Sequence, residues 1–201
     1  MKLYYFPQTS ALAVQIVAEE AGIALQPVRI DPGTKKTADG GDYLAITAKG
    51  YVPALVLDSG EVLTEVAAII QYLADLKPEA RLAPANGTFA RVRLQETLNY
   101  LSAEIQRAYR PLFDPATPPQ VREAAAELLR RRFALLDRQR ADHDYLMGDE
   151  FTIADAYLFS VTRWAQLVNL DLADFANLQA RQQALASRPA VQAAMRAHGL
   201  M

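Results

Sequence analysis

The sequence contains no cysteine among its 201 residues. Disulfides, zinc–thiolate sites and a cysteine nucleophile are therefore excluded. No apolar run approaches the ~20 residues that a membrane-spanning helix needs. The first residues also lack the basic region, apolar core and small-residue cleavage site of a secretion signal. We therefore expect a protein of the cytoplasm.

Positive and negative charges are nearly balanced in the sequence. The chain has 21 basic and 23 acidic residues, and a net charge of −2. This balance gives no electrostatic reason to bind nucleic acid or an anionic membrane. Apolar residues make up 51% of the chain, as in a packed globular protein. The length suits one domain, or two small ones that share a core.

The first 80 residues alternate between strand and helix signals. Lys2–Phe6 is short and aromatic-rich, as strands are, and Ser10–Ala21 has apolar residues at helical spacing before Gly22. The elements expected next are a strand at 25–30, one helical turn at 42–46, a hairpin of strands at 54–57 and 62–64, and a helix at 65–76. This order predicts a mixed sheet with helices on both faces, provided that the first two strands pair in parallel.

Strand signals cease after residue 80, and Pro84–Gly87 closes a linker. The chain beyond is rich in Ala, Leu, Arg and Glu, which favour helix. The helices expected are one from about residue 88 with an apolar stripe at Leu94, Leu98, Leu101, Ile105 and Ala108, and others at 121–140, 152–168, 175–188 and 189–197. We therefore divide the chain into an α/β domain, residues 1–80, and an all-helical domain, residues 81–201.

Ser10 stands where a helix should begin, just after Pro7 breaks the first strand. Its hydroxyl can cap that helix, which is the commoner role for such a serine. It can instead donate a hydrogen bond to an anion held at the helix N-terminus. Thr9 places a second hydroxyl one residue away. Tyr4 and Tyr5 are poorer donors to a ligand, because strand residues there are expected to pack in the sheet.

Five segments together resemble the beta class of bacterial glutathione S-transferases, nearly from end to end. They are residues 2–7 (LysLeuTyrTyr and Pro7), 35–37 (LysLysThr), 49–55 (LysGlyTyrValProAlaLeu), 63–75 and 151–159. The resemblance implies a thioredoxin-like domain of order βαβαββα, followed by a C-terminal helical bundle that forms the wall of an electrophile site. It further implies a homodimer, glutathione as co-substrate and no metal.

The resemblance also implies how the first domain would bind glutathione. Val52 precedes a cis Pro53 and pairs through its backbone with the glutathione cysteine, whereas a lone X-Pro bond is usually trans. Glu65 and the Val66 N–H hold the γ-glutamyl group. Without the resemblance, a Thr-Glu pair at the start of a helix more often has only a structural role, in which the glutamate carboxylate stabilises the first helical turn. Lys35 contacts the glycyl end, whereas most loop lysines are merely solvated.

In the helical domain, Asn99, Ala103 and Gln106 fall at i, i+4 and i+7 and so share one helix face. Such a face is usually just solvated, but by resemblance these positions contact glutathione and line a cleft between the domains. The electrophile site is expected at Gln106, Tyr109 and Trp164. A separate pattern, Thr152-x-x-Asp155, reads as a structural capping box that starts a core helix.

The sequence departs from the beta-class pattern at three positions of the catalytic region. Members of the class typically carry cysteine where this chain has Ser10, histidine at Gln106, and serine or glycine at Val66. Without the cysteine no mixed disulfide with glutathione can form, so a glutaredoxin-like redox enzyme is excluded. Conjugation can survive, because a hydroxyl donor at a helix N-terminus stabilises a thiolate.

We therefore expect a transferase that conjugates the glutathione thiolate to small hydrophobic electrophiles in detoxification. Ser10 would be the catalytic residue, with Thr9 as the alternate. The alternative is a non-catalytic or weakly active protein of the same fold that binds hydrophobic ligands. Retention of Glu65, Val52-Pro53 and Lys35 favours glutathione binding.

Overall fold

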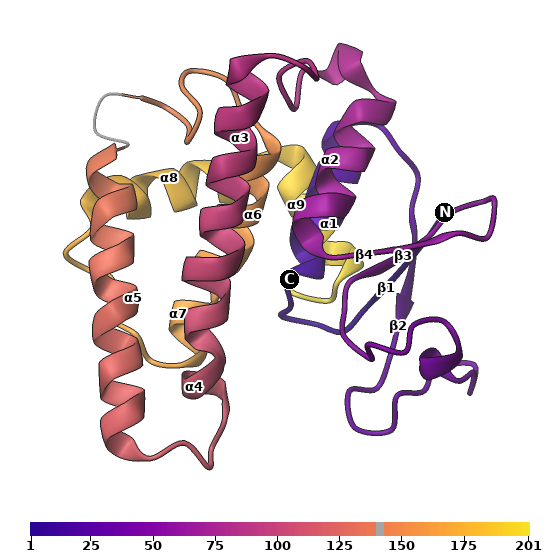
Figure 1. Ribbon diagram of the computed structural model, residues 1–201, viewed down its shortest axis with the longest axis horizontal. Coiled ribbons are helices and arrows are strands. Elements are labelled where there is room, and N and C mark those ends of the chain that lie inside the picture. Colours follow the sequence, from indigo (N-terminus) through magenta and orange to yellow (C-terminus); the bar gives the residue numbers. More distant parts are fainter. Residues whose placement is uncertain (140–142) are drawn as a thin grey trace. The chain divides into compact units, whose positions relative to one another are not determined.

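The computed structural model of the chain describes residues 1–139 and 143–201 (Figure 1). The described chain forms two compact units: Met1–Ala83 with Arg188–Met201, and Pro84–Ser187. The C-terminal segment thus belongs to the same unit as the N-terminal residues. The domain boundary expected after residue 80 stays a prediction, and each unit is described by itself below.

A four-stranded mixed sheet forms the centre of the first unit, with strand order β2-β1-β3-β4. The strands are β1 (Lys2–Tyr5), β2 (Gln26–Arg29), β3 (Ala54–Val56) and β4 (Val62–Thr64). β1 pairs with β2 in parallel and with β3 antiparallel, and β3 and β4 form the expected hairpin. The parallel first pair, on which the prediction of a mixed sheet depended, is therefore confirmed.

The long helices of this unit lie together, and α1 packs against both of the others (Figure 1). They are α1 (Ala11–Glu20), α2 (Val66–Leu76) and α9 (Pro189–Ala197). The expected turn at 42–46 is a single 3-10 turn, η1 (Tyr43–Ala45), which Asp42 caps by accepting from the Leu44 N–H. A second 3-10 turn, η2 (Pro78–Ala80), follows α2. The order βαβαββα is confirmed, with one short turn as its second helix.

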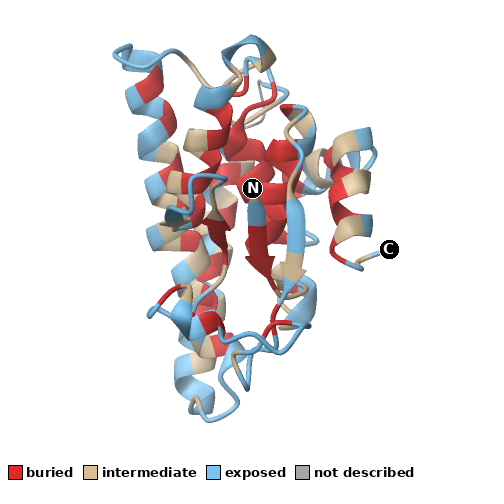
Figure 2. Cartoon of the chain, turned by 90° about the vertical axis from the view of Figure 1, so that its right-hand side faces the viewer, coloured by how far each residue is buried: buried red, intermediate tan, exposed pale blue. Residues whose placement is uncertain are grey.

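The central strand β1 is buried on both of its faces (Figure 2). Tyr4 packs with Ile30, Tyr43 and Ala54 in a cluster under η1. The Tyr43 hydroxyl donates to the Tyr51 carbonyl at 2.6 Å, and burial raises the pKa of Tyr43 to about 12. Tyr4 and Tyr5 are only 8% and 7% exposed, so both tyrosines pack in the sheet as expected.

Helices alone make up the regular structure described in the second unit. They are α3 (Phe89–Tyr100), η3 (Leu101–Gln106), η4 (Arg107–Tyr109), α4 (Arg110–Phe113), α5 (Pro119–Gln139), α6 (Ile153–Thr162), α7 (Trp164–Leu167) and α8 (Ala176–Ala186). The all-helical prediction is confirmed, but the expected end of the long helix at Arg140 lies outside the described residues. The helix expected over 152–168 is divided at Arg163 into α6 and α7.

The first helix of this unit does not stay α-helical. Its predicted stripe is buried at Leu94, Leu98, Leu101 and Ile105, while Ala108 is half-buried. The chain widens to a π-helical segment over η3 and tightens to a 3-10 turn over η4. Pro111 has no N–H to complete an α-helical bond, and this is consistent with the tightened turn before it.

The predicted capping box starts α6. The Thr152 side chain accepts from the Ala154 N–H, and Asp155 accepts from the Thr152 N–H at 2.9 Å. Asp155 also accepts from the Leu146 N–H, so this fully buried carboxylate ties the preceding loop to the helix. Across residues 1–139 and 143–201, no helix has the length and apolarity to cross a membrane.

His198 follows α9 and is buried in the first unit without a polar partner. It is 1% exposed, and in the described chain neither ring nitrogen has a hydrogen-bond partner. Its ring lies 4.1 Å from that of Tyr5, centroid to centroid, and the Tyr5 hydroxyl donates to the Ala197 carbonyl. Burial lowers the pKa of His198 to about 4. The folded unit therefore contains the neutral imidazole.

We predict that His198 makes the protein acid-sensitive. Above pH ~6.5 the histidine is neutral in both states and adds no pH dependence. As the pH falls towards 4, His198 binds a proton in the unfolded chain but stays mostly neutral in the folded chain. The free energy of unfolding therefore falls by up to ~3 kcal/mol. Urea unfolding at a series of pH values should show a shallower loss for His198→Phe than for the wild type.

The matched control is His143→Gln, because His143 is the only other histidine and its side chain is exposed. It should follow the wild-type curve. If His198→Phe and wild type lose stability in parallel between pH 6.5 and 4, His198 is not the group responsible.

Candidate functional site

Ser10 lies immediately before α1, but its side chain does not cap the helix. The residue adopts helical backbone angles, φ −65° and ψ −6°, instead of the extended angles of a capping serine. It is 2% exposed, and no hydrogen bond to its hydroxyl occurs in the described chain. The capping interpretation is therefore wrong, and the hydroxyl is available to donate.

Backbone N–H groups lie next to this hydroxyl at the start of α1. The first backbone bonds of the helix run from Leu12 N–H to the Thr9 carbonyl and from Ala13 N–H to the Ser10 carbonyl. The N–H groups of Ser10 and Ala11 have no backbone acceptor in the described chain. Such unpaired N–H groups, with the helix dipole, favour an anion at this end of the helix.

Thr9 differs from Ser10 in that its hydroxyl is already committed. Thr9 Oγ1 donates to the Phe6 carbonyl at 2.7 Å. A hydroxyl has one proton to donate, so Thr9 would have to break this bond to serve a ligand. The geometry therefore favours Ser10 over Thr9.

Val52 and Pro53 lie just before β3, and the bond between them is cis, as the resemblance implied. Val52 is half-buried, and its N–H and carbonyl have no backbone partner in the described chain. Ala54 at the start of β3 pairs with Thr64 at the end of β4. Val52 and Glu65 therefore lie at the same end of the hairpin, where an extended peptide could add its own backbone hydrogen bonds.

Glu65 joins β4 to α2 in a strained backbone conformation. Its φ is 72° and its ψ is 120°, which a residue with a side chain rarely adopts. Such outliers gather at ligand-binding sites. The Glu65 carbonyl accepts from the N–H groups of Ala68 and Ile69, which leaves those of Val66 and Ala67 without a backbone acceptor. The Val66 side chain is core, but its N–H is available.

Lys49 is a site residue that the sequence reasoning did not single out. Its Nζ lies 3.1 Å from Glu65 Oε1 and 2.9 Å from Thr64 Oγ1. The ion pair holds one carboxylate oxygen and leaves the other side of the Glu65 carboxylate for a ligand. The only signal was that Lys49 opens one of the matched segments, but nothing in the spacing showed that it reaches Glu65.

Lys35 lies in the loop after β2 with a positive φ of 57°. Its N–H donates to the Asp31 carbonyl and its carbonyl accepts from the Tyr43 N–H, so the backbone is fixed on both sides. The Lys35 Cε lies 3.9 Å from where a Cβ on Gly50 would stand. Within the described chain no carboxylate pairs with the Lys35 ammonium. The lysine thus brings a free positive charge close to the segment before Val52.

In the second unit, Asn99 is exposed near the end of α3, and Ala103 and Gln106 lie on η3. A π-helical segment inside a helix is frequent at functional sites. Its wider turn also means that the α-helical spacing used to place the three residues on one face does not hold across it. Ala103 is exposed and Gln106 is half-buried.

Gln106 is oriented by a buried tyrosine. The Tyr157 hydroxyl donates to Gln106 Oε1 at 2.7 Å, and Tyr157 is 1% exposed. The amide oxygen is therefore engaged, and the Gln106 amide nitrogen has no partner in the part of the chain that the structure describes. Gln106 can donate hydrogen bonds, but it cannot gain or lose a proton near pH 7.

Tyr109 and Trp164 lie in an aromatic cluster with Phe113. The ring centroid of Trp164 lies 5.5 Å from each of the other two rings, at angles close to perpendicular. Tyr109 is fully buried, its hydroxyl lacks a partner in the described chain, and burial raises its pKa. Phe113 is 45% exposed and was not predicted as a site residue. The exposed part of this cluster is therefore Phe113 with Trp164, whereas Tyr109 supports them.

Metal ligation has no candidate among residues 1–139 and 143–201. No group of three or more histidine, aspartate or glutamate side chains there is arranged to hold a metal ion. The polar groups described at the candidate site of the first unit are instead backbone N–H groups, the Ser10 hydroxyl, the Glu65 carboxylate with its partner Lys49, and the Lys35 ammonium. Groups of these kinds can bind the charged ends and the backbone of a short peptide.

Known proteins of one family match both units. Residues 1–75 match the N-terminal domain of glutathione S-transferases, and residues 100–189 match their C-terminal domain. Glutathione S-transferase GstA of Escherichia coli O157:H7 is 40% identical over 200 residues, which cover 100% of both chains.

Two solved structures agree over the full length. A beta-class glutathione S-transferase of Sphingomonas chungbukensis has 41% identity and a TM-score of 0.97, covering 100% of both chains. A sphingomonad glutathione S-transferase, solved in complex with glutathione, has 42% identity and a TM-score of 0.96, again covering 100% of both chains. The fold and the beta-class resemblance are confirmed: the chain belongs to the glutathione S-transferase family and is an enzyme of that family by homology.

Proposed function

We propose that this enzyme binds glutathione as its thiolate at Ser10 and conjugates it to small hydrophobic electrophiles. The observation that carries the proposal is the Ser10 hydroxyl, which the helix does not use as a cap. A free thiol has a pKa near ~8.5, so only a few per cent is thiolate at neutral pH. A hydroxyl and two N–H groups at the start of α1 would stabilise the charged form.

The first unit would hold the tripeptide through backbone groups and the Lys35 ammonium, which otherwise lack partners, and through Glu65, which also pairs with Lys49. The Val52 backbone would pair with the cysteinyl residue beside Pro53. The N–H groups of Val66 and Ala67 would bind the γ-glutamyl carboxylate, and Glu65 would bind the γ-glutamyl ammonium. Lys35 would bind the glycyl carboxylate. The sphingomonad relative in complex with glutathione supports this assignment.

The second unit supplies the remaining groups of the proposal. Asn99, Ala103 and Gln106 are assigned to glutathione, with Gln106 donating through its amide nitrogen. Gln106 and Trp164 are assigned to the electrophile, with Tyr109 behind Trp164. The exposed edges of Phe113 and Trp164 suit an apolar, aromatic electrophile. A homodimer, a cytoplasmic location and a role in detoxification stay predictions.

The chemistry of the proposed step needs no protein sulfur. The glutathione S–H loses its proton to solvent as it binds, because Ser10 donates to the sulfur and Gln106 cannot take up charge. The thiolate then forms a carbon–sulfur bond with the electrophile, and a leaving group departs with the electron pair. A disulfide exchange through the protein is excluded, because the chain has no cysteine.

Glu65→Gln should weaken glutathione binding by ~1–3 kcal/mol, because a charge-assisted bond to the ligand ammonium is lost. Calorimetric titration with glutathione measures the change, and circular dichroism checks the fold. Glu61→Gln is the control, since Glu61 is an exposed glutamate on the nearby hairpin. It should bind like the wild type. Equal affinities for Glu65→Gln and wild type would remove Glu65 from the site.

Ser10→Ala should raise the pKa of bound glutathione by roughly one to two units, because one charge-assisted hydrogen bond to the thiolate is lost. Conjugation at neutral pH should slow accordingly. Ultraviolet absorbance of the thiolate, titrated against pH in the saturated complexes, measures the shift. Thr9→Val is the control and should leave the titration where the wild type has it.

Two outcomes would argue against this assignment. Superimposable titrations of Ser10→Ala and wild type would show that another donor holds the thiolate, and a shift in Thr9→Val alone would identify it as Thr9. If glutathione bound to the wild type titrates like the free thiol, the alternative of a non-catalytic binding protein gains support.

A further inference from the structure

A hollow of about 490 Å³ lies within the second unit, and none of the residues assigned above to glutathione or the electrophile lines it. It is open to solvent and is lined by the end of α6, by α7, by the segment 170–173 and by α8. Sites for small molecules have volumes of roughly 300–1,000 Å³. The hollow is therefore large enough for a ligand of modest size.

The inner wall of the hollow is apolar. Phe159, Ala165 and Leu178 line it and are no more than 4% exposed, and the half-buried Leu170 and Leu172 add to this wall. The half-buried Leu170 and Leu172 present the apolar area that a ligand can remove from water, and covering it gains free energy in proportion to that area. The ligand should therefore have an apolar body.

Arg163, between α6 and α7, carries a positive charge and is one of the residues that line the same hollow. It is half-buried, with its guanidinium 5.7 Å from the centroid of the Phe159 ring. Within the described chain no carboxylate pairs with it and no carbonyl accepts from it. Arg130 and Arg181, also partly buried, each pair with an aspartate. A half-buried cation without an anion is costly, and burial accordingly lowers the pKa of Arg163.

Amide side chains form the rim. Gln182 donates to the Phe159 carbonyl and Gln179 to the Leu172 carbonyl, each at 2.9 Å. Gln166 and Gln183 are exposed, and in the described chain their side chains make no hydrogen bond. Besides the Asp171 carboxylate, the rim thus offers neutral donors and acceptors, and Arg163 is the only cation among the lining residues.

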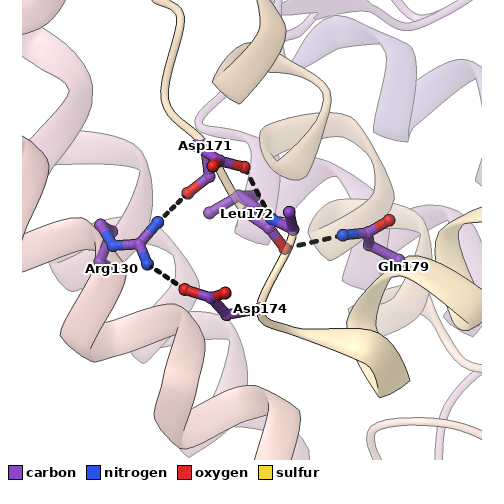
Figure 3. Close-up of polar contacts among 6 residues, drawn as sticks. Arg130, Asp171, Leu172, Asp174 and Gln179 are labelled. Atoms are coloured by element: carbon purple, nitrogen blue, oxygen red, sulfur yellow. Dashed lines mark hydrogen bonds and ion pairs between the residues drawn. The ribbon is translucent and has the colours of Figure 1, made fainter.

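The part of the wall formed by the segment 170–173 is held in place before any ligand arrives (Figure 3). Arg130 donates to the Asp171 carbonyl and pairs with Asp174 at 2.6 Å. The Asp171 carboxylate accepts from the Ala173 N–H at 2.8 Å, so it is already engaged at the rim. A preformed wall lowers the entropic cost of binding.

We propose that this hollow binds a small carboxylic acid with an apolar, aryl or alkyl body. The carboxylate forms a bidentate pair with the Arg163 guanidinium, whose planar fork matches it. The body lies against Leu170 and Leu172, with the buried Phe159, Ala165 and Leu178 behind them, and the free amides of Gln166 and Gln183 contact its polar edge. The site belongs to the second unit alone and does not depend on glutathione chemistry.

The test compares phenylbutyrate with phenylbutanol, which has the same apolar body but no charge. Both are titrated calorimetrically into the full-length protein saturated with glutathione, so that the candidate glutathione site is filled. Phenylbutyrate should bind at least ~10-fold more tightly, the effect of one charge-assisted pair. Absence of phenylbutyrate binding, or equal affinities for the two probes, overturns the proposal.

Variants at position 163 locate the binding. Arg163→Gln should reduce the affinity for phenylbutyrate to that for phenylbutanol, and Arg163→Lys should retain part of the preference because it keeps the charge but loses the fork. Arg107→Gln, which removes an exposed arginine outside the hollow, is the control and should bind like wild type. Unchanged phenylbutyrate affinity in Arg163→Gln overturns the site. Should that variant fail to fold, Arg163→Lys and the comparison of probes in the wild type decide.

Discussion

The burial of β1 is the constraint on which the candidate site depends. Lys2–Tyr5 pairs with β2 on one side and β3 on the other, and its residues beyond Lys2 are buried. The chain must therefore leave the sheet at a fixed point and enter α1, which is itself held between α2 and α9. The packing of β1 and α1 sets the position of Ser10, so the start of the helix does not depend on a capping hydrogen bond from the Ser10 hydroxyl.

The same end of the sheet collects backbone groups that the fold leaves unpaired. Buried or half-buried N–H and carbonyl groups normally find partners. Around Val52, Val66 and Ala67 the described chain supplies none, and Glu65 is kept in a strained conformation that directs its carbonyl to Ala68 and Ile69. A bound peptide would provide the missing partners, and this supports the proposal that these groups bind glutathione.

Structure that depends on residues close together in the sequence could be predicted. The spacing of apolar residues indicates the strands and helices, and the spacing of Thr152 and Asp155 alone predicts the capping box. Features set by packing could not. The helical backbone of Ser10, which removes its capping role, depends on α1 as a whole. The π-helical segment that carries Gln106 has no sequence signature, and the contact of Lys49 with Glu65 joins residues 16 positions apart.

The central claim is that the protein stabilises glutathione as a thiolate. The most direct measurement is a calorimetric titration of glutathione at pH 7, repeated in buffers that differ in protonation enthalpy. If the thiol ionises on binding, about one proton should be released per glutathione bound, because free glutathione is almost wholly protonated at this pH. S-methylglutathione, which has no thiol proton, should release none. Binding of glutathione with no more proton release than S-methylglutathione would contradict the account.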